Sequence, residues 1–152
     1  MLTKNGPKIL EYNVRFGDPE TQVIFPLVDD DLIALLYASA TNQSLPDSIK
    51  LSSDKCMTVV IASEGYPGHY PKGGLISFPD ELPEKTDIIH AGTILKEGKI
   101  YSNGGRVLSV TSKDKTIFKA RDKIYSLCEA INYKSKYYRK DIAYREMKRL
   151  CE

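Results

Sequence analysis

Residues 116–132 read TIFKARDKIYSLCEAIN and carry the clearest helical pattern of the chain. Their apolar residues recur at the spacing of one helix face, which predicts an amphipathic helix. These residues are Ile117, Ala120, Ile124, Leu127, Cys128 and Ile131. Earlier in the chain, residues 57–62 (MTVVIA) form a continuous apolar run that predicts a buried strand. We therefore expect a small strand-rich domain closed by a helix.

The other strands expected in this domain are short. They lie at residues 75–78, 88–96, 99–102 and 106–111. Turn dipeptides at 97–98 (Glu-Gly) and 103–104 (Asn-Gly) separate the last three, which predicts a three-stranded meander. The loop at residues 64–74 is rich in glycine but lacks the Gly-x-x-x-x-Gly-Lys-Ser/Thr pattern. It is therefore better interpreted as a structural loop than as a phosphate cradle.

The amino-terminal residues follow different patterns. Residues 8–16 (KILEYNVRF) alternate with period two, which predicts a strand with one polar and one apolar face. Asp18 and Pro19 predict the N-cap and first position of a short helix, which Pro26 interrupts. A second helix is expected after the three aspartates at 29–31, whose charge suits a helix N-terminus.

Composition limits the class of protein. The 152 residues are 41% hydrophobic and 28% charged, with a net charge of +2, which is ordinary for a soluble globular domain. This charge is too small to argue for nucleic acid or an anionic membrane, and no apolar stretch approaches the ~20 residues of a membrane span. Cys56, Cys128 and Cys151 fit neither a disulfide framework nor a zinc pattern. Unpaired thiols and a cytoplasmic location are expected.

The polar face of the expected strand at 8–16 contains Glu11, Asn13 and Arg15. Two residues apart on a strand, a carboxylate and an amide carbonyl lie side by side and could hold a hard cation such as Mg²⁺. A solvated strand face has the same pattern. From spacing alone, the solvated face is the simpler interpretation.

Several motifs resemble one enzyme family. Residues 15–22 (RFGDPETQ) and 6–14 (GPKILEYNV) resemble the signature of glycinamide ribonucleotide synthetases, also called phosphoribosylamine–glycine ligases. Further matches follow in order at residues 65–68 (GYPG), 90–93 (HAGT), 103–108 (NGGRVL) and 137–142 (YYRKDI). The resemblance covers essentially the whole chain.

This resemblance implies an ATP-grasp ligase of the α+β class. Residues 1–48 would be the carboxy-terminal end of the ATP-grasp domain, as a strand plus two helices. Residues 49–152 would be a small antiparallel β-rich carboxy-terminal domain closed by a helix. In this family ATP phosphorylates glycine, and 5-phosphoribosylamine displaces phosphate from the glycyl phosphate. The products are glycinamide ribonucleotide, ADP and phosphate, in de novo purine biosynthesis.

Position by position, the resemblance also implies roles near the signature. Glu11 and Asn13 match the ligands of Mg²⁺ (or Mn²⁺), which would bridge the phosphates of the co-substrate ATP. Arg15 could stabilise the acyl phosphate or form a structural salt bridge. Asp18 and Glu20 could hold an amine substrate, although Asp18 is equally explained as a helix cap.

Two further candidates lie in the carboxy-terminal part. Arg106 follows a glycine turn, and in related ligases such an arginine grips the ribose 5-phosphate of the substrate. Alternatively, Arg106 pairs with Asp87 or Glu97 and stabilises the meander. Lys72, in the glycine-rich loop, is the other substrate-binding candidate.

The family's amino-terminal domain and most of its ATP-grasp domain have no counterpart in these 152 residues. We therefore expect the chain alone to be inactive, as a fragment or one part of a split ligase that needs the amino-terminal portion. A non-catalytic binding or assembly module is the alternative. The basic, tyrosine-rich tail at 133–152 is interpreted as a packed segment rather than a nucleic-acid site, because its YYRKDI sequence matches the family.

Overall fold

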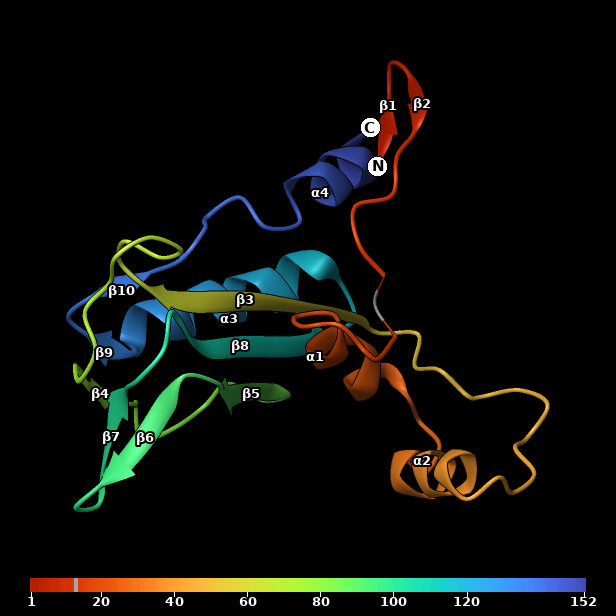
Figure 1. The fold of residues 1–152 in the computed structure, drawn as a ribbon, viewed down its shortest axis with the longest axis horizontal. Helices are drawn as coiled ribbons and strands as arrows, with labels where there is room; N and C mark the ends of the chain where they lie inside the picture. Colours follow the sequence, from red (N-terminus) through yellow and green to blue (C-terminus); the bar gives the residue numbers. More distant parts are fainter. Residues whose placement is uncertain (13) are drawn as a thin grey trace.

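The computed structural model describes residues 1–12 and 14–152 (Figure 1). The amino-terminal elements are β1 (Leu2–Thr3), β2 (Gly6–Pro7), α1 (Thr21–Ile24), the 3-10 helix η1 (Phe25–Leu27) and α2 (Leu32–Ala40). The rest are β3 (Lys55–Ser63), β4 (Leu75–Ser77), β5 (Thr86–His90), β6 (Thr93–Lys96), β7 (Lys99–Ser102), β8 (Arg106–Asp114), α3 (Ile117–Ala130), β9 (Asn132–Tyr133), β10 (Lys136–Tyr137) and α4 (Tyr144–Cys151). This mixture of helices and small antiparallel sheets, with a helix near the end, confirms the α+β class.

Two four-stranded sheets organise residues 55–137. Their strand orders are β10-β3-β8-β5 and β6-β7-β4-β9, and all their pairings are antiparallel. The long strands β3 and β8 pair from Lys55 opposite Asp114 to Ala62 opposite Arg106. The apolar run at 57–62 is the centre of β3, so its prediction as a buried strand is confirmed.

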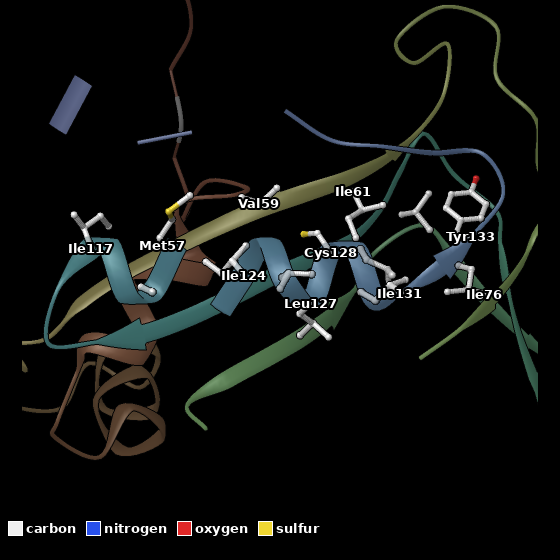
Figure 2. Packing of buried hydrophobic residues seen from close by; sticks show 14 residues of the cluster. Met57, Val59, Ile61, Ile76, Ile117, Ile124, Leu127, Cys128, Ile131 and Tyr133 are labelled. Atoms are coloured by element: carbon white, nitrogen blue, oxygen red, sulfur yellow. The ribbon is translucent and has the colours of Figure 1, made fainter. Parts of the chain in front are cut away.

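Helix α3 forms the core with the sheet of β3 and β8 (Figure 2). The buried residues of α3 are Ile117, Ala120, Ile124, Leu127 and Cys128, all five from the predicted apolar face. Fully burying such a large aliphatic side chain stabilises the fold by about 1.5–3 kcal/mol. After the helix, Lys136 Nζ donates hydrogen bonds to the carbonyls of Cys128 and Ile131, both at 2.6 Å, and so satisfies acceptors at the helix end.

The cysteines have no disulfide partners among the described residues, as the sequence predicts. Burial raises the pKa of the Cys56 thiol to about 11 and that of Cys128 to about 12. Both thiols are therefore protonated at neutral pH. No helix of the described residues has the length and apolar character needed to span a bilayer.

The predicted three-stranded meander is wrong. Its first strand is divided at Gly92 into β5, which pairs with β8, and β6, which pairs with β7. A Cβ at Gly92 would lie 2.5 Å from the carbonyl oxygen of Arg106 and 2.7 Å from Cα of Gly104. The glycines therefore permit a close backbone crossing between the two sheets. Residues 103–105 connect β7 of one sheet to β8 of the other instead of forming a hairpin.

The predicted strand at 8–16 is also wrong, because residues 8–12 and 14–16 have no strand conformation. The apolar side chains of this segment are exposed, with Leu10 at 72%, Tyr12 at 81% and Val14 at 94%. Alternation specifies which face of a strand is apolar, but a strand also needs a neighbour that pairs with its backbone. Among the described residues, no strand pairs with this segment.

The helix expected after Asp18 is present but begins at Thr21. Asp18 is not its cap, because the Asp18 carboxylate accepts a hydrogen bond from Gln22 Nε2 at 2.6 Å. Helix α2 is confirmed, and its N-cap Asp31 accepts from the backbone N–H of Ala34 at 3.0 Å. The polar stretch at 42–53 contains no helix or strand, and the proposed domain boundary between residues 48 and 49 stays a prediction.

Candidate functional site

Residues 15–22, here called the signature segment, make a tight turn and enter α1. The Gly17 carbonyl accepts a hydrogen bond from the backbone N–H of Thr21 at 3.0 Å. The Glu20 carboxylate folds back over Gly17, where a Cβ would displace it. Figure 1 shows α1 lying against the long β3–β8 pair, toward the end where β3 begins and β8 ends, which brings the signature segment to the sheet.

Arg106, the first residue of β8, reaches the signature segment because of a β-bulge. Ile61 of β3 lies opposite Leu108, but Ala62 lies opposite Arg106, so Val107 is an extra residue. Without it, Arg106 would share a face with Leu108, which packs in the α3 core. The bulge turns the side chain to the other face, toward α1, as bulges beside functional sites often do.

On that face, Arg106 pairs with Asp18. Its Nη1 lies 3.3 Å from Asp18 Oδ2, and the two side chains are 45% and 44% exposed. An ion pair this exposed contributes at most about 1 kcal/mol, so a more highly charged anion can replace the carboxylate. The expected structural partners are wrong: Asp87 lies opposite Thr111 in the middle of β8, and Glu97 lies in the β6–β7 turn.

A pocket of about 550 Å³ lies where these parts meet. Three of the predicted site residues line it, namely Arg15, Asp18 and Arg106. Its other lining residues are Phe16, Gly17, Thr21, Gln22, Phe25, Pro26 and Ile89. The structure thus brings the signature segment and the NGGRVL motif together, although Arg106 and Asp18 are 88 residues apart in sequence.

The remaining predicted site residues are not gathered at this pocket. Glu20 lies beside Gly17, and Lys72 is exposed in the loop at 64–74. Glu11 belongs to the irregular segment before the signature, while Asn13 lies outside the described residues. Within the described part of the chain, no group of three or more His, Cys, Asp or Glu residues is placed to hold a metal ion. The assignment of Glu11 and Asn13 therefore stays a prediction.

The sequence alone did not predict that Pro19 and Tyr66 lie beside Arg106. Arg106 also borders a second pocket of about 340 Å³, beside Pro19 and Tyr66. The Tyr66 ring packs so closely over Gly105 that a Cβ there would overlap it. One sign of this contact was present in the sequence, because the GYPG and NGGRVL motifs both match the family. Only the fold shows that the two motifs are in contact.

Comparison with known proteins establishes the family. The model of the family described as "Phosphoribosylglycinamide synthetase, C domain" matches residues 56–145. The chain belongs to this family. It is 40% identical to the "Phosphoribosylamine--glycine ligase" of Agrobacterium fabrum over 149 residues, covering 98% of the chain and 35% of that protein. It is 48% identical over 148 residues to the "Trifunctional purine biosynthetic protein adenosine-3" of Gallus gallus, covering 95% of the chain and 15% of that protein.

A solved structure agrees with these sequence matches. The crystal structure of the phosphoribosylamine–glycine ligase of Thermotoga maritima superimposes with a TM-score of 0.74 and 38% identity, covering 93% of this chain and 34% of that one. The resemblance predicted from the sequence is confirmed, and the relatives' names place them among ligases and purine-biosynthetic proteins. The chain spans about a third of the length of the matched ligases.

Proposed function

We propose that this chain is the carboxy-terminal portion of an ATP-dependent ligase that joins glycine to 5-phosphoribosylamine through a glycyl phosphate. The products would be glycinamide ribonucleotide, ADP and phosphate, in de novo purine biosynthesis. The observation that best supports this proposal is the contact between Arg106 and the signature segment in one pocket. Two motifs that match the family separately are neighbours in space.

Arg106 would bind the 5-phosphate of phosphoribosylamine. A guanidinium offers a planar pair of donors that matches two phosphate oxygens, which a lysine does not. Asp18 is the present partner of Arg106. A doubly charged phosphate would displace it from the half-exposed pair, and the released carboxylate would then be available for the substrate amine.

The other residues would have lesser or separate roles. Arg15 lines the same pocket and would stabilise the acyl phosphate. Glu20 and Lys72 are substrate-binding candidates by resemblance alone. Because neither lines the pocket with Arg106, we expect smaller effects from their substitution.

Glu11 and Asn13 would hold the Mg²⁺ or Mn²⁺ ion. A carboxylate and an amide carbonyl are donors that suit a hard cation. When bound, the ion would neutralise charge on the phosphates of ATP. Pairing of the alternating segment 8–16 with a strand of the remaining ligase would bring both oxygen donors to one side of a sheet.

The amino-terminal portion of the ligase would supply the segments that hold ATP, and the chain alone would have no turnover. The intact enzyme would use glycine, 5-phosphoribosylamine and ATP, without nucleic acid or membrane partners, in the cytoplasm. The tail agrees with the packed-segment interpretation, because Tyr125 Oη of α3 donates to the Arg139 carbonyl at 2.9 Å. The alternative is a non-catalytic binding or assembly module.

A chimeric ligase tests the proposal. Residues 1–152 would replace the aligned segment of the Agrobacterium fabrum ligase, and ADP release dependent on glycine and phosphoribosylamine would be measured. We expect turnover within about ten-fold of the parent enzyme and none from the isolated chain. Glu11→Gln and Asn13→Ala should each lower turnover by about ten-fold or more, since metal-held charge stabilisation amounts to several kcal/mol. Glu81→Gln, on an exposed residue, is the matched control.

Melting temperatures identify unfolded variants. A folded chimera without turnover would contradict the ligase proposal and favour the binding module. Turnover by the isolated chain would contradict the need for an amino-terminal portion. Near-normal turnover of the folded Glu11→Gln chimera would contradict the metal assignment alone.

A further inference from the structure

Arg106 contacts the signature segment from one face of β8. The same face makes a second polar contact, with the helical unit of residues 21–27 that consists of α1 and η1. Lys113, near the other end of β8, donates from Nζ to the carbonyl oxygen of Pro26 at 2.7 Å. Side chains alternate along a strand, and the bulge at Val107 shifts the alternation by one residue. Arg106 and Lys113 therefore project to the same face, where one contacts Asp18 before α1 and the other contacts η1 after it.

The Pro26 carbonyl is suited to an external donor. It lies in η1, the last turn of the helical unit, where backbone carbonyls lack donors from the helix itself. The next backbone N–H, that of Val28, bonds to Phe25 rather than to Pro26. A lysine ammonium supplies a charge-assisted bond, which is shorter and stronger than a neutral one. Pro26 also lines the pocket that contains Arg15 and Arg106, so this bond fixes one wall of the pocket.

Within its own sheet, Lys113 is not among the described residues that form a salt bridge. Its cross-strand neighbour is Cys56, and burial raises the pKa of that thiol to about 11. The thiol is therefore neutral near pH 7 and gives the ammonium no counter-charge. The other residues of β8 on this face, Ser109 and Thr111, are uncharged, and the carboxylate on this face is that of Asp87 in β5, opposite Thr111. The contact of Lys113 with Pro26 is thus its distinguishing feature.

We propose that Lys113 is a positioning residue of the site, which fixes the helical unit of residues 21–27 on β8 and so sets the distance between the signature segment and Arg106. This inference rests on the proposed function. Without the bond, the unit keeps its apolar contacts with the sheet but loses its fixed angle. Asp18 and Arg15 then no longer face Arg106 in one geometry, and binding of phosphoribosylamine weakens while binding of ATP does not.

The test compares Lys113→Met, which keeps the length of the side chain without the donor, with Lys113→Arg, which keeps a charged donor. Lys99→Met, on an exposed lysine of the β6–β7 hairpin, is the matched control. In the isolated chain, amide hydrogen exchange is measured for residues 21–28 and for α3. Lys113→Met should speed the exchange of residues 21–28 about three-fold or more and leave the exchange of α3 unchanged. Lys99→Met should leave the exchange of both regions unchanged.

In the chimeric ligase, Lys113→Met should raise the KM for phosphoribosylamine about three- to ten-fold and leave the KM for ATP unchanged. Lys113→Arg should return the KM for phosphoribosylamine most of the way to that of the unmodified chimera. A purely structural lysine would lower the melting temperature without this selective change in KM. Unchanged exchange, or unchanged KM in an active chimera, overturns the positioning role alone. A folded chimera without turnover in any form overturns the proposed function and this inference with it.

Discussion

The molecule has two regions that differ in how they are stabilised. Residues 54–133 contain a buried core, in which Ile61, Leu108 and Ile124 have no exposed surface. By contrast, residues 1–12 and 14–53 include no buried residue, although their sequence contains many apolar side chains. The difference teaches that hydrophobic patterning produces a stable element only where a partner surface lies within reach. It also means that the candidate site joins a rigid part, carrying Arg106, to a part held by a few contacts.

The largest expected effect is on the core. Leu127→Ala removes a side chain that is 2% exposed, and such substitutions reduce the free energy of unfolding by about 2–5 kcal/mol. Ile33→Ala, in α2, removes a side chain that is 80% exposed. This substitution should change the free energy of unfolding by less than about 0.5 kcal/mol. Urea unfolding measures both. Similar losses from the two substitutions would show that the regions do not differ as described.

A smaller effect is expected at the crossing of the two sheets. Gly92→Ala places a Cβ against backbone atoms that cannot move aside, so we expect a loss of about 1–3 kcal/mol. Gly68→Ala is the control, because its nearest contact would be at 3.2 Å. The same unfolding experiment gives both values. If Gly92→Ala were as stable as the control, the crossing would not depend on glycine.

The smallest effect depends on pH and concerns the start of the core region. The Lys115 ammonium, by hydrogen bond and by charge, holds the pKa of Asp54 below its ordinary value of 3.8. A carboxyl whose pKa is lower in the folded state stabilises the fold above its unfolded pKa, and this contribution is lost as pH falls through the folded pKa. Asp54→Asn should therefore be less stable than the unmodified chain at pH 7, and the difference should shrink below about pH 4. A difference independent of pH would contradict the ion pair.

Most of the core region could be predicted from the sequence. The helix at 116–132 was predictable because its 3.6-residue period extends over four turns, and the run at 57–62 because it is continuously apolar. The division of 88–96 into two strands was not, since it depends on contact between Gly92 and Gly104, twelve residues apart. The prediction of a strand at 8–16 failed for the opposite reason. The local pattern of this segment is clear, but no described strand pairs with it.

The candidate site was predictable in composition but not in arrangement. Family motifs indicated Arg15, Asp18 and Arg106, and these three line one pocket. The pairing of Asp18 with Arg106 could not be predicted, because it depends on the bulge at Val107, which no local pattern indicates. The contact of Lys113 with Pro26 gave no signal in the sequence, because the accepting carbonyl is 87 residues away.

The most direct test of the proposed site is the set of Michaelis constants of the chimeric ligase with Arg106→Ala. A charge-assisted bond to phosphate amounts to about 1.5–3 kcal/mol, so the KM for phosphoribosylamine should rise by roughly ten-fold or more. Arg106→Lys should recover only part of this loss, because lysine lacks the planar pair of donors. The KM values for ATP and glycine, and the melting temperature, should remain nearly unchanged. A lower melting temperature with all three constants unaltered would make Arg106 a structural residue and contradict the account.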